Sequence, residues 1–95
     1  MPFVYEVTLA EEPTLYKLKQ QLVPAGTLVG TGQNVAVLTD GTNEFHLRAP
    51  LQGLNVEWFA SSGDALSSDD PIARIVAEGS EQPVSAATPV RIQSC

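Results

Sequence analysis

From Phe3 to Leu9 the chain has an apolar side chain at every second position, and Val4 is the one apolar residue between them. Four apolar side chains fall on one face of this segment: Phe3, Tyr5, Val7 and Leu9. The intervening positions, which include Glu6 and Thr8, fall on the other face, and this period of two is typical of a half-buried β-strand. Pro13 follows, and because proline cannot donate a ladder hydrogen bond it ends the pattern.

The rest of the chain consists of short apolar runs separated by turn residues. The runs include "TLVGTGQ", "NVAVLT", "EFHLRAP", "LNVEWF" and "IARIVA", and Gly, Pro, Asn and Asp lie between them. The best helical candidate, residues 11–22, contains Pro13 and fits a strand after a turn equally well. Many short strands with this punctuation predict an all-β fold, either a sandwich or a barrel.

A displacement of 37 residues places one half of the chain over the other without a gap. Residues 13–38 then lie over residues 50–75, and both segments run through a strand, a glycine turn, a short strand, a polar turn and a strand. Apolar positions coincide along the two halves: Leu22 with Phe59, Val29 with Leu66, Val35 with Ile72, and Leu38 with Ile75. Neither half can close a core alone, so the pattern predicts two quasi-repeats packed as a pseudo-twofold pair.

The segment between the halves, residues 39–49, must then form the hairpin that connects them. Asp40 and Gly41 are a favoured turn dipeptide because glycine adopts positive φ without a steric cost.

These features together resemble the biotinyl/lipoyl carrier domains over about residues 3–76. In the first half the resemblance lies in "LVPAGTLVGTGQNVAVLTD", and in the second it lies in "RAPLQGLNVEWFASSGDALSSDDPIARI". The resemblance implies a flattened barrel-sandwich hybrid of two interlocking four-stranded sheets. It also implies that the connecting hairpin is the place where such domains carry their prosthetic group.

The chain departs from the carrier pattern at the residue that carries the chemistry. Lipoyl members have "TDK" in the hairpin and acylate the lysine, whereas this chain has Thr39, Asp40 and then Gly41. Glycine offers no amine, so we expect no lipoyl or biotinyl group and no other cofactor. The two lysines, Lys17 and Lys19, are predicted to lie in the opening strand of the first half, far from the hairpin.

Composition limits the remaining classes of function. The chain has 95 residues, is 43% hydrophobic and carries a net charge of −6, so we expect one folded domain that does not bind nucleic acid. Cys95 is the only cysteine, which excludes an intramolecular disulfide. No signal-peptide pattern and no apolar run of membrane-spanning length is present, so a cytoplasmic protein that does not insert into membranes is expected.

The candidate site residues gather mainly in the hairpin. They are Asp40, Gly41, Thr42, Asn43, Glu44 and His46, with Trp58 as a further contact residue. Glu44 and His46 share a strand face and could form a metal or acid–base pair, although an exposed polar face is the simpler interpretation.

Two other features have a structural and a functional interpretation. Asp64, Asp69 and Asp70 lack the spacing of an EF-hand, so we interpret them as turn residues and expect no metal. Trp58 and Phe59 point to opposite faces of one strand. Phe59 is predicted to lie in the core and Trp58 either at the surface or half-buried.

The last residues lie outside the resemblance. We therefore divide the chain into a lipoyl-like β domain (1–79) and a tail (80–95) that is either disordered or an added edge strand. The Ser, Ala and Pro content of the tail is typical of a flexible linker, whereas the alternation of Val90 and Ile92 with Arg91 could add an edge strand, which could pair within the chain or across a homodimer.

Three classes of function remain. The first is a non-enzymatic interaction module, recognised by an unidentified protein partner through the hairpin. The second is a carrier modified at Lys17, Lys19 or Cys95, and the third is a small-molecule or metal-binding domain that uses His46. An enzyme is not expected, because no nucleophile, base and orienting group can be assembled.

Overall fold

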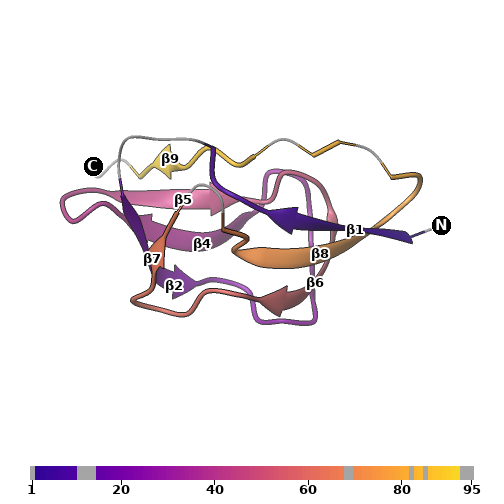
Figure 1. The fold of residues 1–95 in the computed structure, drawn as a ribbon, viewed down its shortest axis with the longest axis horizontal. Coiled ribbons are helices and arrows are strands. Elements are labelled where there is room, and N and C mark those ends of the chain that lie inside the picture. The colour runs from indigo at the N-terminus through magenta and orange to yellow at the C-terminus, as the bar shows by residue number, and fades with distance from the viewer. Residues whose placement is uncertain (1, 11–14, 68–69, 82, 85, 93–95) are drawn as a thin grey trace.

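The computed structural model describes residues 2–10, 15–67, 70–81, 83, 84 and 86–92. These residues form nine strands and no helix (Figure 1). The strands are β1 (Pro2–Val7), β2 (Tyr16–Gln21), β3 (Thr27–Val29), β4 (Asn34–Thr39), β5 (Glu44–Arg48), β6 (Gly53–Trp58), β7 (Ala65–Leu66), β8 (Ala73–Glu78) and β9 (Val90–Arg91). The all-β prediction is therefore confirmed. Within the candidate helix of residues 11–22, residues 16–21 form β2, and residues 11–14 lie outside the described residues.

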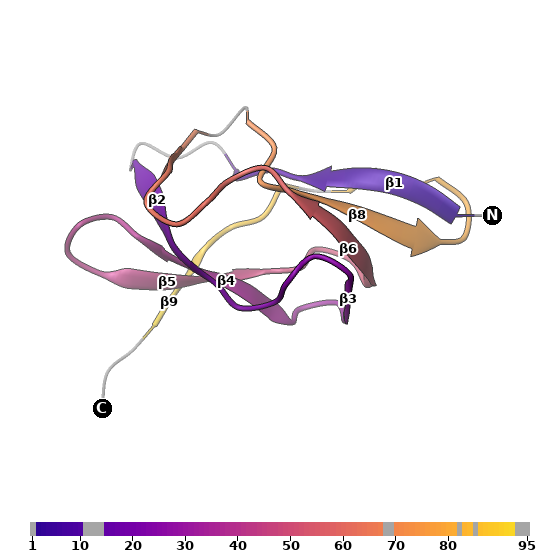
Figure 2. The same ribbon diagram turned by 90° about the horizontal axis from the view of Figure 1, so that it is seen from below.

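The strands are arranged in two sheets in which every pairing is antiparallel. One sheet has the order β1-β8-β6-β3 and the other has the order β7-β2-β4-β5-β9. Figure 2 shows β1, β8 and β6 together on one side of the molecule, with β4 and β5 on the other. Among the described residues, no helix is long and apolar enough to cross a membrane.

The core lies between the two sheets and follows the alternation of the sequence. Phe3, Tyr5 and Val7 of β1 are buried while their neighbours in the strand are exposed, and Leu9 is buried just beyond the strand. The largest fully buried side chains come from both halves of the chain: Leu18, Leu38, Leu47, Ile72, Ile75, Val7 and Asn55. The prediction of an N-terminal strand is thus confirmed, as is the prediction of which of its faces is buried.

The two halves of the chain have the same strands at the predicted displacement. Residues 16–21 of β2 correspond to residues 53–58 of β6, and β3 and β4 correspond to β7 and β8 within one or two residues. The short strands are exchanged, because β3 pairs with β6 whereas β7 pairs with β2. Each half therefore completes the sheet of the other half, which explains why neither half can close a core alone.

The equivalence extends to individual hydrogen bonds. Gly26 N donates to Asn55 O over 2.6 Å, and in the other half Gly63 N donates to Leu18 O over 2.7 Å. The pairing of β2 with β4 has a β-bulge between Leu18 and Gln20, and the pairing of β6 with β8 has one at the equivalent place. These hydrogen bonds and bulges therefore recur in the two halves at the displacement of 37 residues.

The C-terminal segment returns along the body of the molecule (Figure 1). Ala87 is buried and forms a parallel bridge with Leu9, and its backbone N donates to Thr8 O over 2.7 Å. Val90 and Arg91 then pair with β5 as β9. Of the two alternatives for the tail, the added edge strand is the one found in residues 86–92, and it pairs within the chain.

Candidate functional site

The candidate site is the hairpin that connects β4 and β5. Thr39 and Glu44 form the last pair of the ladder, and the backbone N of Asp40 donates to Asn43 O over 3.2 Å. Gly41 has a φ of +99°, a conformation in which an L side chain is strained. The sequence therefore places glycine where the turn requires it, and the Asp-Gly turn prediction is confirmed.

The side chain of Asp40 fixes the turn from within. Its Oδ1 accepts hydrogen bonds from Asn43 N over 2.7 Å and from Thr42 N over 2.8 Å. These two backbone donors hold the pKa of the Asp40 carboxyl below its usual value of 3.8, and the positive charge of Arg91 adds a smaller effect in the same direction. The tip of the hairpin thus carries a carboxylate that is ionised at neutral pH.

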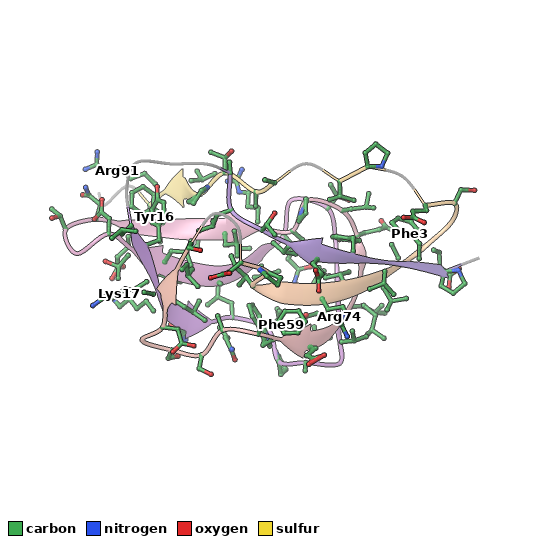
Figure 3. All side chains as sticks on the ribbon, viewed as in Figure 1. Phe3, Tyr16, Lys17, Phe59, Arg74 and Arg91 are labelled. Carbon is green, nitrogen blue, oxygen red and sulfur yellow. The ribbon has the colours of Figure 1, made fainter. Side chains whose placement is uncertain are left out.

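Three further hydrogen bonds order the hairpin. The Thr39 hydroxyl donates to Asn43 O over 3.1 Å and accepts from Gly41 N over 3.1 Å. On the outer edge, Arg91 Nη2 donates to Asn43 Oδ1 over 3.1 Å. Figure 3 shows Arg91 at the end of the molecule where the hairpin lies, so β9 supports the turn.

Both lysines of the first half lie close to the hairpin, so the expectation that they are far from it is wrong. Lys19 Nζ forms an ion pair with Glu44 Oε2, and Lys17 is paired in register with Thr39. The reason is the sheet order, because β2 pairs directly with β4 and a repeat pattern does not specify which strands become neighbours. The ion pair is exposed, so its contribution to stability is about 0 to 1 kcal/mol.

His46 lies on the same strand as Glu44, at a position two residues farther from the tip. It is half-buried and stands between Val37 of β4 and Val90 of β9 in the ladder. Across the described ranges, no three His, Cys, Asp or Glu side chains gather in an arrangement that could hold a metal ion. Cys95 and Asp69 lie outside the described residues.

Asp64 and Asp70 of the second half act within turns. Asp64 Oδ2 accepts a hydrogen bond from Ser61 N over 2.8 Å, and Asp70 Oδ2 accepts one from the Ser67 hydroxyl over 3.0 Å. Both contacts agree with the interpretation of these residues as turn formers.

The prediction that Phe59 lies in the core is wrong. Phe59 is 39% exposed, and the guanidinium of Arg74 lies 5.1 Å from the centre of its ring (Figure 3). Trp58 instead packs against the core, and its indole Nε1 donates to Val23 O over 2.9 Å. The bulge after Asn55 is the cause, since one extra residue moves every following side chain to the opposite face.

Trp58 also lies apart from the other candidate residues. It belongs to β6, in the sheet that does not contain the hairpin. The structure therefore brings together the candidates from Asp40 to His46, adds Lys19 and Arg91 to them, and leaves Trp58 outside the group. The alternation in the tail was the sequence signal for Arg91, whereas nothing in the sequence pattern indicated Lys19.

No family model and no curated protein matches the sequence of this chain.

Proposed function

We propose that this protein is a non-enzymatic interaction module of lipoyl-like fold that carries no prosthetic group. A protein partner recognises it through the hairpin surface, which we define as Asp40, Gly41, Thr42, Asn43, Glu44 and His46. The observation that carries the proposal is the Gly41 turn. Hydrogen bonds donated by backbone N–H groups of the turn to the side-chain oxygens of Asp40 and Thr39 hold a glycine at the tip, where the resemblance leads us to expect an acylated lysine.

The lipoyl-like part of the proposal is supported by the exchange of strands between the halves. β3 and β7 each cross to the sheet of the other half, and without β9 each sheet has four strands. The hairpin connects β4 and β5 at one end of the two sheets. The resemblance leads us to expect the carrier site in this hairpin.

The chemistry of the hairpin surface indicates the kind of partner. Asp40 presents a carboxylate whose pKa is lowered, and a chain with a net charge of −6 attracts basic surfaces over long range. The proposed partner therefore places a lysine or arginine against Asp40. The turn is already ordered by its own hydrogen bonds, so little conformational entropy is lost when the partner binds.

The proposal is tested by reversing the charge of the hairpin in a tagged chain. The chain is purified from the cytoplasm of its own cells, which is its proposed location. The variant Thr42→Lys with Glu44→Lys keeps both hydrogen bonds to Asp40, because these use backbone donors. We expect the recovered amount of at least one co-purified protein to be about tenfold or more lower with the variant than with the wild type. When that protein is purified and mixed with the chain, its dissociation constant for the variant should exceed its dissociation constant for the wild type by the same factor.

A matched control makes the same change in charge elsewhere. Ser80→Lys with Glu81→Lys alters two exposed residues just after β8, in the turn at the opposite end of the molecule from the hairpin (Figure 1). The control should leave the recovery of the partner unchanged. If both variants lose the same proteins, the attraction depends on net charge alone and the hairpin surface is not the recognition site.

A second candidate function is a carrier that is modified at Lys17 or Lys19. It is favoured by one observation, that β2 places both lysines beside the base of the hairpin. The intact mass of the denatured protein from its own cells distinguishes the two: the interaction module has the mass of the bare chain, whereas an acylated lysine adds a covalent increment.

A further inference from the structure

The exposed guanidinium of Arg91 lies beside the hairpin surface and is not neutralised by contact with a carboxylate. Arg74 and Lys19 each form ion pairs with glutamate side chains. Arg91 instead donates from Nη2 to the uncharged side-chain oxygen of Asn43 over 3.1 Å, and no ion pair joins it to a carboxylate of the residues that the structure describes. Its positive charge therefore remains open to a group from outside the chain.

Arg91 is held in place through both its backbone and its side chain. Its backbone is in register with Phe45 of β5, and the next residue, Ile92, donates from N to Glu44 O over 2.9 Å. The hydrogen bond to Asn43 then positions the guanidinium at the end of the molecule where the hairpin lies (Figure 3). A side chain that is already positioned loses less conformational entropy on binding than a free one does.

The guanidinium of Arg91 has donors left for a second acceptor. Its N–H groups form a planar fork, and within the described part of the chain its side chain makes only the contact with Asn43. The fork matches the two oxygens of a carboxylate, and such a charged pair is stronger than a hydrogen bond between neutral groups. The residue type therefore favours a carboxylate as the group that Arg91 binds.

The fold does not require a charge at this position. β9 lies outside the two quasi-repeats, and Arg91 is exposed and contributes nothing to the core. Asn43 needs only a neutral donor for its side-chain oxygen, which a glutamine would also supply. The charge of Arg91 is thus unexplained by the contacts within the described residues, and an external carboxylate explains it.

Arg91 and Asp40 present opposite charges at the same end of the molecule. Backbone donors of the turn are the main cause of the lowered pKa of Asp40, and the charge of Arg91 adds to them, which places Arg91 near this carboxylate. The two side chains do not form an ion pair with each other. Each of them can therefore bind a separate group of one partner.

We propose that Arg91 is a specificity-determining residue of the hairpin surface and binds a carboxylate of the protein partner. The inference rests on the function proposed above and adds a second requirement to it, since a basic group of the partner faces Asp40 and an acidic group faces Arg91. The net charge of −6 attracts basic surfaces in general. A partner with basic groups alone meets repulsion from Arg91, so this residue selects among the surfaces that the net charge attracts.

A library of random peptides displayed on phage and selected against the purified full chain tests the requirement. The wild type should enrich peptides that contain both a basic and an acidic residue. Arg91→Gln keeps a donor for Asn43 but removes the charge, so it should enrich peptides that keep the basic residue without the acidic one. Arg48→Gln is the matched control, because Arg48 is an exposed arginine at the other end of β5, and it should enrich the same peptides as the wild type.

Calorimetric titration of a peptide enriched by the wild type measures the contact itself. Arg91→Gln should raise the dissociation constant about three- to tenfold, and so should replacement of the acidic residue of the peptide by its amide. The two changes together should raise it no further than either alone, because both remove the same ion pair. Arg91→Lys keeps the charge without the fork and should lie between the wild type and Arg91→Gln. Circular dichroism checks that every variant is folded.

The outcomes separate this inference from the function on which it rests. If Arg91→Gln enriches the same peptides as the wild type, or if the two changes in the titration act independently, Arg91 does not select the partner and the inference is overturned while the hairpin function stands. If Thr42→Lys with Glu44→Lys enriches the same peptides as the wild type, the hairpin surface is not the recognition site and both proposals fail. A wild type that enriches no peptide also overturns both.

Discussion

Leu18 and Asn55 occupy the same position in the two halves of the molecule. Each is the third residue of its strand and precedes a β-bulge. The backbone O of each accepts a hydrogen bond from a glycine of the other half. Leu18 has no exposed surface and Asn55 is 2% exposed. Within the described part of the chain, neither Oδ1 nor Nδ2 of Asn55 has a hydrogen-bond partner.

Replacing Asn55 with leucine should stabilise the protein. The substitution removes two buried polar atoms from a site whose equivalent already accommodates leucine, and leaving a buried polar group unpaired costs about 1 to 3 kcal/mol. We expect the free energy of unfolding, measured by urea denaturation, to rise by about that amount. The reciprocal variant Leu18→Asn should destabilise the protein, and a loss of stability in Asn55→Leu would show that the two sites are not equivalent.

Gly41→Ala should lower the free energy of unfolding by about 1 to 2 kcal/mol, because a Cβ at positive φ is strained. No atom lies within 4 Å of the added Cβ, so the loss comes from the backbone conformation alone. Gly30→Ala is the matched control: its φ is not in the positive range and its nearest contact, Gln33 Oε1, is at 3.8 Å. Equal thermal denaturation midpoints for the two variants would contradict this account of the turn.

The strands and the turn at Asp40 and Gly41 could be predicted from the sequence because they depend on local patterns. β4, for example, coincides with the run "NVAVLT", and the glycine turn lies at the tip of the hairpin. The repeat could also be predicted, because the spacing of apolar residues is similar in the two halves. Local patterns of this kind report what each residue prefers along its own strand.

The predictions that were wrong depend on how strands pair with one another, which local patterns do not report. The match of Phe59 with Leu22 in the other half predicts a core position, but the extra residue in the β-bulge of β6 turns Phe59 outward, and Leu22 is itself 40% exposed. The pairing of β2 with β4 joins segments about twenty residues apart, and only this pairing places Lys19 beside Glu44.

Asp40 should titrate below its usual pKa of 3.8 in a carbon-detected nuclear magnetic resonance experiment. The hydrogen bonds from Asn43 N and Thr42 N to its carboxylate are the main cause, so Arg91→Gln should raise the midpoint only slightly. Since the folded pKa is depressed, the stability that Asp40 contributes is present above its unfolded pKa and is lost as the pH falls through the folded value. A large rise in Arg91→Gln would mean that charge, and not the backbone donors, controls this group.

Tyr5 should make the protein less stable at alkaline pH. Burial raises the pKa of Tyr5 from 10.0 to about 12, and its hydroxyl donates to the backbone O of Leu51. Because the folded pKa is the higher one, the contribution of Tyr5 is fully present below pH 10 and is lost as the pH rises toward 12. Urea denaturation of the wild type at pH 8 to about 11.5 should show this decline. Tyr5→Phe, which loses about 1 kcal/mol at neutral pH with the hydrogen bond, should decline less steeply over the same range. Parallel declines in the two proteins would show that another group is responsible for the alkaline loss.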